Sequence, residues 1–285
     1  MYYCEAIGLI MSVFSFAMGA CIASFLNVVI WRVPRGESIA TPPSHCPKCG
    51  AAIRWWQNLP IVSWLALRGK CAKCHAPISV RYILVETLGG VLFLAAFWRF
   101  GVYSPFIWVW ISLMIAGSFI DFDHQLLPDF VTVGGMVYGV VLSLLSWLCA
   151  MHSPVPAMPL YPAFQPFAAP PLNALAGLAL GFSLLWAVRW LGTRVFGREA
   201  MGMGDVFLMG AVGALFGPVA VLVTLILSSL VGSIAGIAMI VATKAKVGRL
   251  VAIPYGPYIC LGCLVWMFRG PEIVVWYLSL FKTVS

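Results

Sequence analysis

Charged side chains are scarce in this sequence. Only 9% of its 285 residues are Asp, Glu, Lys or Arg and just nine residues are acidic, whereas 62% are hydrophobic. The mean hydropathy is +0.99. No soluble domain has enough interior to bury such an apolar fraction. The composition therefore excludes a soluble enzyme and predicts an all-α polytopic membrane protein.

Long polar segments are also few, and the apolar runs between them reach the roughly 20 residues that a helix needs to cross a bilayer. The first run has no basic segment before it and no small-residue cleavage site before Arg32, so we expect it to remain as a helix rather than to be removed as a signal peptide. The sixth run is short and rich in glycine, which leaves seven helices as the alternative count. The runs that predict about eight transmembrane helices are residues 7–30, 82–98, 104–120, 130–150, 173–191, 203–217, 218–243 and 254–280.

Basic residues fall mainly on one side of the predicted membrane. Of the 17 Lys and Arg residues, 14 lie in alternate connections between the helices. Cytoplasmic loops carry such an excess, so we place these connections in the cytoplasm and both chain termini outside. Because the basic residues are divided among several short loops, we expect no nucleic-acid partner. The uncharged, proline-rich segment 152–171 is predicted to be an external loop, and its sequence indicates no role.

The one long polar segment, residues 31–81, contains two Cys-x-x-Cys pairs, Cys46/Cys49 and Cys71/Cys74. The 21 residues between the pairs are one more than the upper end of the usual spacing in four-cysteine zinc sites, about 15–20 residues. Structural Zn²⁺ takes four thiolates in a tetrahedron, and each pair presents two. We therefore predict a structural zinc site with these four ligands and expect the flanking histidines, His45 and His75, to be bystanders.

Two other interpretations of the four cysteines remain open, namely two disulfides or four free thiols. Disulfides are disfavoured in a loop assigned to the reducing cytoplasm. The remaining cysteines are expected to pack within helices, and they are Cys4, Cys21, Cys149, Cys260 and Cys263. The predicted organisation is a first transmembrane helix (1–30), a cytoplasmic zinc loop (31–81) and a multi-helix membrane core (82–285).

Acidic residues are concentrated at two helix ends. The stretch "FIDFDHQLLPDF", residues 119–130, holds three of the nine, and the first of them, Asp121, ends the third predicted helix. Asp205, in "GMGD", opens the sixth helix on the same side of the membrane. Ionisable groups retained near the bilayer core are functional candidates, because insertion at a helix centre costs about 2.5–3.5 kcal/mol. Two neighbouring carboxylates can act as base and acid, which is the chemistry of metal-free amide hydrolysis.

Less specific interpretations of the same residues also exist. Asp205 can serve as a helix N-cap, Asp129 can cap the fourth helix, and Asp123 can be a solvated loop residue. An ion-coupled transporter could use Asp121 and Asp205 as a cation site. A membrane thiol redox protein could use the Cys-x-x-Cys pairs, although it needs them in an oxidising compartment.

Several motifs occur together and in order along the chain. They are "SFLNVVIWRVP", "HCPKCG" followed by "RWWQNLPIVSWLALRGKCAKCHAPISVRYILVE", then "IDFDHQLLPD" and "GMGD". In this combination the chain closely resembles the bacterial prepilin peptidases of type IV pili and type II secretion, from residue 20 to about 215. The resemblance implies that the catalytic aspartates are Asp121, seven residues before Pro128, and Asp205 of the Gly-x-Gly-Asp motif.

The same resemblance implies the activity and its location. The chain is expected to be an aspartyl endopeptidase of the bacterial cytoplasmic (inner) membrane that cleaves the leader of prepilins and pseudopilins after its glycine, with its active site and zinc loop on the cytoplasmic side. Members with the four-cysteine loop are bifunctional and then methylate the new N-terminal residue with S-adenosylmethionine. No Rossmann-type Gly-x-Gly-x-x-Gly loop follows a predicted strand, so this second activity rests on the resemblance alone.

Overall fold

The computed structural model of the protein describes residues 2–152, 171–199, 201–243 and 254–282. Within these residues the regular structure is helical, and strand-type pairing is limited to two isolated bridges in the loop after the first helix. The expected all-α class is therefore confirmed. The chain divides into two compact units, Met1–Ala116 and Gly117–Ser285. The three-part organisation predicted from the sequence stays a prediction.

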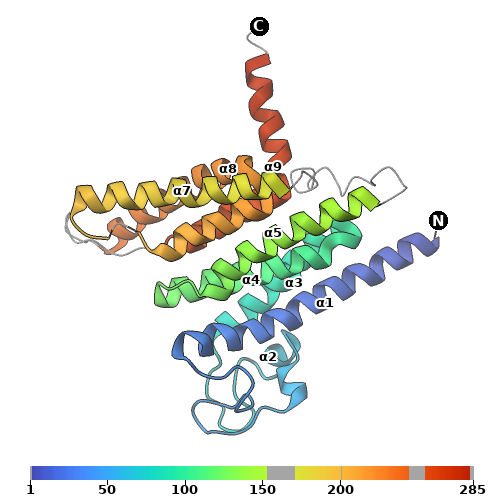
Figure 1. Cartoon of the computed structure of the whole chain (residues 1–285). Helices are drawn as coiled ribbons and strands as arrows, with labels where there is room; N and C mark the ends of the chain where they lie inside the picture. The colour runs from blue at the N-terminus through green and yellow to red at the C-terminus, as the bar shows by residue number, and fades with distance from the viewer. Residues whose placement is uncertain (1, 153–170, 200, 244–253, 283–285) are drawn as a thin grey trace. The chain divides into compact units, whose positions relative to one another are not determined.

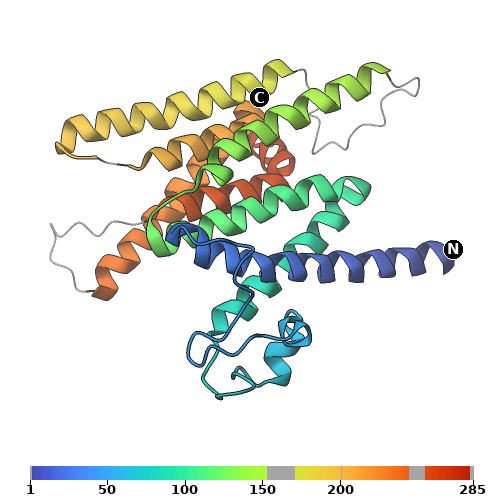
Figure 2. The ribbon, with the colours of Figure 1, turned by 60° about the horizontal axis from the view of Figure 1, so that its bottom comes forward.

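Long helices carry both units. The first unit contains α1, a loop with three short helical turns, α3 and the beginning of α4 (Figure 1). The second contains the end of α4 and the helices α5, α7, α8 and α9 (Figure 2). The bounds are Tyr2–Arg32 for α1, Val33–Arg35 for η1, Trp55–Asn58 for η2, Val62–Ala66 for α2, Val80–Phe100 for α3, Gly101–Tyr103 for η3, Ser104–His124 for α4, Asp129–His152 for α5, Pro171–Phe196 for α7, Met203–Thr243 for α8 and Gly256–Lys282 for α9.

Glycines let the helices of each unit approach closely. In the first unit, α1 crosses α3 where Gly19 lies against Gly89, and a Cβ on Gly19 would overlap the backbone of α3. In the second, Gly177 of α7 lies against Gly213 of α8, and α7 runs along α8 in both ribbon views (Figures 1 and 2). Close approach of small residues stabilises helix pairs in lipid, where apolar burial alone provides little driving force.

Two buried charged residues tie the loop of the first unit to its helices. Arg32, at the end of α1, donates to the carbonyl groups of Ser38 (2.9 Å) and Pro42 (2.7 Å). Glu86 of α3 accepts a hydrogen bond from the N–H of Ile61 at 2.7 Å. Buried charges must be hydrogen-bonded to be tolerated, and here the three bonds hold the loop against α1 and α3.

Six helical segments in the described part of the chain are long and apolar enough to cross a membrane. Two of them are unusually long. Val80–His124 comprises α3 and α4, which are separated by the turn η3. Met203–Met239 contains a break at Gly217 (φ 80°, ψ −178°), followed by Pro218, at the boundary predicted between the sixth and seventh helices. The count of eight stays a prediction, and residues 153–170 of the predicted external loop lie outside the described residues.

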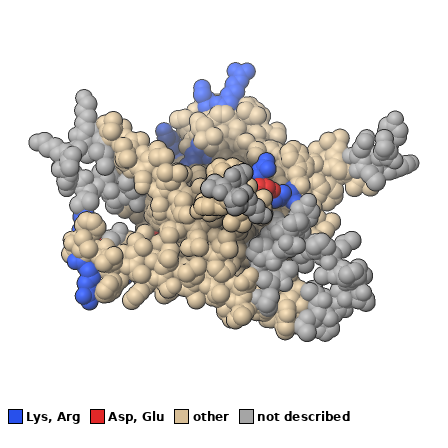
Figure 3. All heavy atoms as spheres, turned by 90° about the horizontal axis from the view of Figure 1, so that it is seen from above, with Lys and Arg blue, Asp and Glu red and all other residues tan. Residues whose placement is uncertain are grey.

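The exposed surface of these helices is largely apolar. Many large side chains are more than half exposed, for example Leu9, Trp98, Ile226 and Trp276. Figure 3 shows a face on which uncharged residues predominate and Lys, Arg, Asp and Glu occupy small areas. Such a surface is expected where the surrounding solvent is lipid, so the chain is a multi-pass membrane protein.

Candidate active site and metal cluster

Asp121 lies in the last turn of α4 and is only 5% exposed. The helix ends at His124, and Gln125 adopts a left-handed conformation (φ 52°) while its N–H donates to the Asp121 carbonyl at 2.8 Å. The C-terminal end of a helix carries a partial negative charge, so a carboxylate there is unfavourable unless a positive group faces it.

The N-terminus of α9 provides that group. Gly256, the first residue of α9, donates its N–H to Asp121 Oδ2 at 2.9 Å. The preceding Tyr255 fixes this end of α9, because its hydroxyl is hydrogen-bonded to Ser228 (2.8 Å) and Ser229 (3.2 Å) of α8. A Cβ on Gly256 would lie 2.7 Å from Asp121 Oδ2, so the approach of backbone to carboxylate requires glycine at this position.

Gly256→Ala is therefore expected to displace the Asp121 carboxylate and to lower kcat by about 100-fold, the loss typical of a misplacement of about 1 Å in an active site. The measurement is the rate of the leader cleavage that the sequence motifs predict, at equal amounts of inserted protein. Gly134→Ala on α5 is the matched control, because the nearest atom to its Cβ is 3.8 Å away. A Gly256→Ala protein that cleaves as fast as the Gly134→Ala protein would contradict this role.

Asp205 lies in the first turn of α8, where the partial positive charge of the helix end favours a carboxylate. Its side chain is 8% exposed, and its Oδ1 has no hydrogen-bond partner among the described residues. Asp205 is also close enough to Asp121 for the two groups to interact electrostatically. A buried acceptor without a partner costs about 1–3 kcal/mol, so this oxygen is a candidate position for a bound water or substrate group.

One leucine spaces the segments that carry the two aspartates. Leu127, in the loop after α4, faces three glycines from α4, α8 and α9. A Cβ placed on Gly204 or Gly256 would lie 2.8 Å and 3.2 Å from Leu127 side-chain atoms, and one placed on Gly117 would lie 3.5 Å away. The second glycine of "GMGD" is thus needed because Leu127 packs where its side chain would be.

The other two acidic residues of this segment are not buried with the pair. Asp123 and Asp129 are exposed, and Asp129 is the first residue of α5, where its charge favours the helix N-terminus. Cys260, one turn after Gly256, is buried and hydrogen-bonded to Ser118 of α4. Cys260 and Cys263 of α9 are buried as expected, whereas Cys21 of α1, for which the same packing was expected, is exposed.

Neither Gly256 nor Leu127 is recognisable as a site residue from the sequence alone. The run "IPYGPY" before the last helix marks a helix start, because proline and glycine interrupt regular structure. That signal does not reveal that the glycine N–H meets a carboxylate 135 residues earlier in the chain.

The four cysteines predicted as metal ligands form a cluster in the loop of the first unit. Their sulfur atoms all lie within 4.8 Å of one another, and Cys46 Sγ is 3.8 Å from Cys74 Sγ. Four sulfurs bound to zinc at about 2.3 Å in a tetrahedron are about 3.8 Å apart, so the donor set and its size fit this ion. Within the described residues none of these cysteines forms a disulfide.

The two Cys-x-x-Cys pairs form the same turn twice. In each, the first cysteine donates its N–H to the carbonyl five residues later and accepts from the N–H four residues later, at 2.9–3.0 Å. The residues that donate in these turns, Gly50 (φ 67°) and His75 (φ 55°), both have positive φ. His75 thus shapes a turn, and the cluster itself is made of cysteines.

Backbone N–H groups prepare these sulfurs to bind a cation. The N–H groups of Cys74 and Lys73 donate to the Cys71 sulfur and lower the pKa of its thiol to about 6. The Ala76 N–H acts in the same direction on Cys74, but desolvation and three neighbouring thiols raise the pKa of Cys74 to about 11. Thiolates this close repel one another, and a bound metal ion removes that repulsion.

Two family descriptions match the chain. The bacterial Peptidase A24 N-terminal domain matches residues 17–100, which include the four cysteines. The type IV leader peptidase family matches residues 108–237, which include Asp121 and Asp205.

Curated proteins are similar over most of the chain. A protein of Myxococcus xanthus named prepilin leader peptidase/N-methyltransferase is 42% identical over 94% of this chain and 76% of its own length. A protein of the same name from Stutzerimonas stutzeri is 36% identical over 92% of each chain. A type 4 prepilin-like proteins leader peptide-processing enzyme of Escherichia coli is 36% identical over 88% of this chain and 91% of its own. No solved structure matches the chain.

Proposed function

Because the chain belongs to the type IV leader peptidase family, we propose that it is a membrane aspartyl endopeptidase with Asp121 and Asp205 as its catalytic pair. The substrates are prepilins and pseudopilins, which it cleaves after the glycine that ends the leader. The observation that carries this proposal is that two buried carboxylates from separate helices lie close enough to interact electrostatically. The Gly256 N–H holds one of them, and the Oδ1 of the other has no hydrogen-bond partner within the described part of the chain.

The pair supplies the base and the acid of amide hydrolysis. One carboxylate takes a proton from water as the water oxygen bonds to the carbonyl carbon of the glycine that ends the leader, while the protonated partner gives its proton to the carbonyl oxygen. When the tetrahedral intermediate collapses, the C–N bond breaks and its electron pair stays on nitrogen, which takes up a proton. The products are a leader ending in a carboxylic acid and a mature protein with a free N-terminal amine.

The membrane fixes where this reaction takes place. Asp121 lies at the end of one candidate span and Asp205 at the start of another. The distribution of Lys and Arg favours the cytoplasmic side for both. A prepilin would then place its basic leader in the cytoplasm and its hydrophobic helix in the bilayer, with the scissile bond at the boundary. The acidic residues at 121, 123 and 129 would also attract the basic leader.

The second activity is methylation of the amine that cleavage exposes. Its support is the names of the relatives, which join leader peptidase with N-methyltransferase. When bound, S-adenosylmethionine supplies the methyl group: the amine lone pair forms the new N–C bond, the S–C pair stays on sulfur in S-adenosylhomocysteine, and the amine loses a proton to water.

The four-cysteine cluster is proposed to hold structural zinc. One zinc per chain is therefore expected in the purified protein, together with four reduced thiols. Removal of the metal by a strong chelator is expected to unfold the loop, since structural zinc contributes an apparent 10–16 kcal/mol or so. In this proposal the aspartates activate water and the metal does not. Any loss of cleavage after chelation should therefore come from the unfolded loop and not from the absence of the ion itself. Purified protein with intact disulfides in place of zinc would contradict this site and favour a thiol redox function.

The decisive experiment is co-expression with a tagged prepilin in cells that lack their own peptidase. The N-terminal mass of the product is expected to show loss of the leader up to its glycine and the addition of one methyl group. An unprocessed prepilin beside correctly inserted protein would overturn the proposed peptidase. Cleavage without methylation would overturn the second activity alone.

A further inference from the structure

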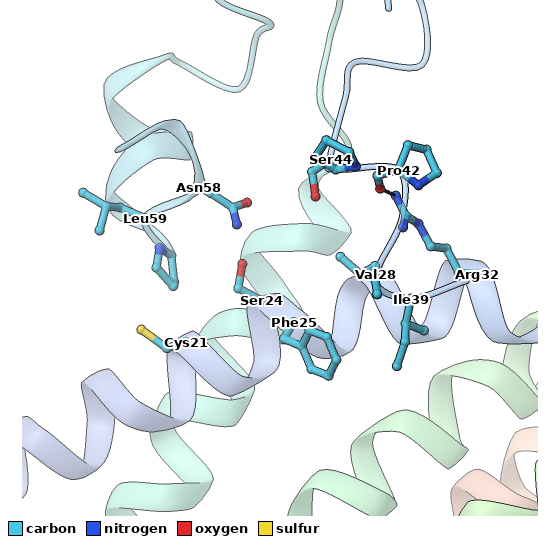
Figure 4. Close-up of a pocket in the computed structure, with 13 residues that line it drawn as sticks. Cys21, Ser24, Phe25, Val28, Arg32, Ile39, Pro42, Ser44, Asn58 and Leu59 are labelled. Carbon is cyan, nitrogen blue, oxygen red and sulfur yellow. Dashed lines mark hydrogen bonds between the residues drawn. The ribbon is translucent and has the colours of Figure 1, made fainter. Parts of the chain in front are cut away.

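A pocket of about 370 Å³ opens between the end of α1 and the loop that follows it (Figure 4). One wall is a single face of α1, since its lining residues recur at helical spacings of three and four. The other wall comes from residues 39–44 and 58–60. Pockets for small organic ligands have volumes of about 300–1,000 Å³, so this one suits a ligand of nucleoside size. The α1 residues are Cys21, Ser24, Phe25, Val28 and Arg32.

Polar groups from three segments converge in this pocket. In Figure 4 the side chains of Ser24, Ser44 and Asn58 point toward the same space. Apolar side chains, among them Phe25 and Leu59, complete the lining. A few convergent polar groups within apolar walls are typical of sites that orient a small molecule.

Arg32 gives the pocket a permanent positive charge. It is 8% exposed and uses two of its N–H groups to hold the carbonyls of Ser38 and Pro42. A guanidinium has five N–H donors, so it can also bind a carboxylate. Among the described residues no acidic side chain lines the pocket. The charge therefore favours a ligand that carries a carboxylate.

A second pocket has neither the polar groups nor the positive charge of the pocket at the end of α1. It lies between α5 and α7 and is lined by apolar residues only, which are Met136, Val137, Val140, Val141 and Leu178. Hydrocarbon can fill such a site, whereas a charged nucleoside would lose its hydration without compensation.

We propose that the pocket at the end of α1 is the binding site of the methyl donor, S-adenosylmethionine; this inference rests on the proposed methylation. The ligand combines an adenine, a ribose and an amino-acid end with a carboxylate. The Asn58 amide offers a donor and an acceptor to an adenine edge, as Asn does when it recognises adenine in nucleic acids. Phe25 and Leu59 offer apolar contact to the base, and Arg32 meets the carboxylate.

The metal cluster supports one wall of this pocket. Ser44 lies two residues before Cys46, and its carbonyl accepts from the N–H of Ile53 at 2.9 Å in the first cysteine turn. Loss of the cluster would release this wall. The proposed site therefore gives the zinc-binding loop of this chain a role in methylation, because the loop holds one wall of the donor pocket in place.

The test fills the pocket and measures both activities in the full-length protein in detergent. Ser24→Phe is expected to raise the KM for S-adenosylmethionine at least about tenfold, and Asn58→Leu by about tenfold, the cost of a lost hydrogen bond to a bound ligand. Leader cleavage and bound zinc should stay unchanged in both. Ala17→Phe is the matched control, because Ala17 is exposed on α1 outside the pocket.

A direct binding measurement removes any dependence on how the variants fold. Cys21 is exposed and lines the pocket, so saturating S-adenosylhomocysteine should slow its alkylation by N-ethylmaleimide at least about tenfold in the unsubstituted protein. Mass spectrometry of the Cys21 peptide reports the rate.

The possible outcomes separate the site from the activity. Unchanged KM in Ser24→Phe and Asn58→Leu, or unchanged Cys21 alkylation at saturating ligand, beside normal methylation, would overturn this pocket as the donor site. Normal cleavage without any methylation by the unsubstituted protein would overturn the methyltransferase half of the proposed function, and this inference with it.

Discussion

Asp121→Asn and Asp205→Asn should each abolish leader cleavage while the protein still inserts into the membrane. An asparagine keeps the size of the side chain, but it can neither take a proton from water nor give one to the leaving amine. A positioned acid or base contributes about 10²- to 10⁴-fold, and loss of either group stops the pair from working as a unit. The measurement is the fraction of a co-expressed prepilin that loses its leader over time.

The same loop offers matched controls. Asp123→Asn and Asp129→Asn make the identical change at exposed positions next to the proposed pair. Both should keep a near-normal kcat, because neither residue belongs to the catalytic pair, and a weaker attraction of the basic leader would raise only the KM. The charge of Asp129 at the start of α5 contributes about 0.3–1 kcal/mol of helix stability. An Asp205→Asn protein that cleaves at the rate of the Asp129→Asn protein would refute the assignment of the pair.

The helical architecture could be predicted because lipid imposes a simple requirement on sequence. Every membrane-spanning helix must hydrogen-bond its backbone groups within itself and present apolar side chains to the lipid. Such a helix can therefore be recognised from a run of consecutive residues alone. Even the break in α8 was visible, since Gly217 and Pro218 stand together inside an apolar run. The spacing of the two cysteine pairs likewise predicted that their four sulfurs could hold one metal ion, and the structure brings these sulfurs within 4.8 Å of one another.

The surroundings of the aspartates could not be predicted in the same way. The N–H of Gly256 reaches Asp121 only because α9 begins beside the end of α4, and that depends on how the helices pack. In the sequence Leu127 is an ordinary loop residue, and only the structure shows that three glycines lie against its side chain. Packing of this kind leaves no period or spacing in the sequence. The pocket at the end of α1 was hidden for the same reason, because its walls come from three separate segments.

Replacing Cys46 and Cys49 together with serine should impair methylation at least as strongly as cleavage. The two changes remove half of the cluster, so the loop should lose the zinc ion that it is proposed to hold and the folding free energy that such an ion contributes. The loop forms one wall of the proposed donor pocket, whereas Asp121 and Asp205 both belong to the other compact unit. Methylation and cleavage of the same prepilin, measured together by mass, give the ratio of the two losses. A variant that loses cleavage but methylates normally would contradict this arrangement.

Asp121→Ala should block both activities on a full-length prepilin, but for a different reason in each case. Cleavage fails because the pair is broken, and methylation fails because an uncleaved substrate has no free amine at the correct residue. A pre-cleaved pilin with a free N-terminal residue supplies that amine directly. The Asp121→Ala protein should therefore methylate it at close to the normal rate, while the Cys46→Ser/Cys49→Ser protein should not. The cysteine cluster and Asp121 lie in separate compact units, so loss of the carboxylate leaves the loop intact. If the Asp121→Ala protein is folded and zinc-loaded and still does not methylate the pre-cleaved pilin, the two sites are not separable.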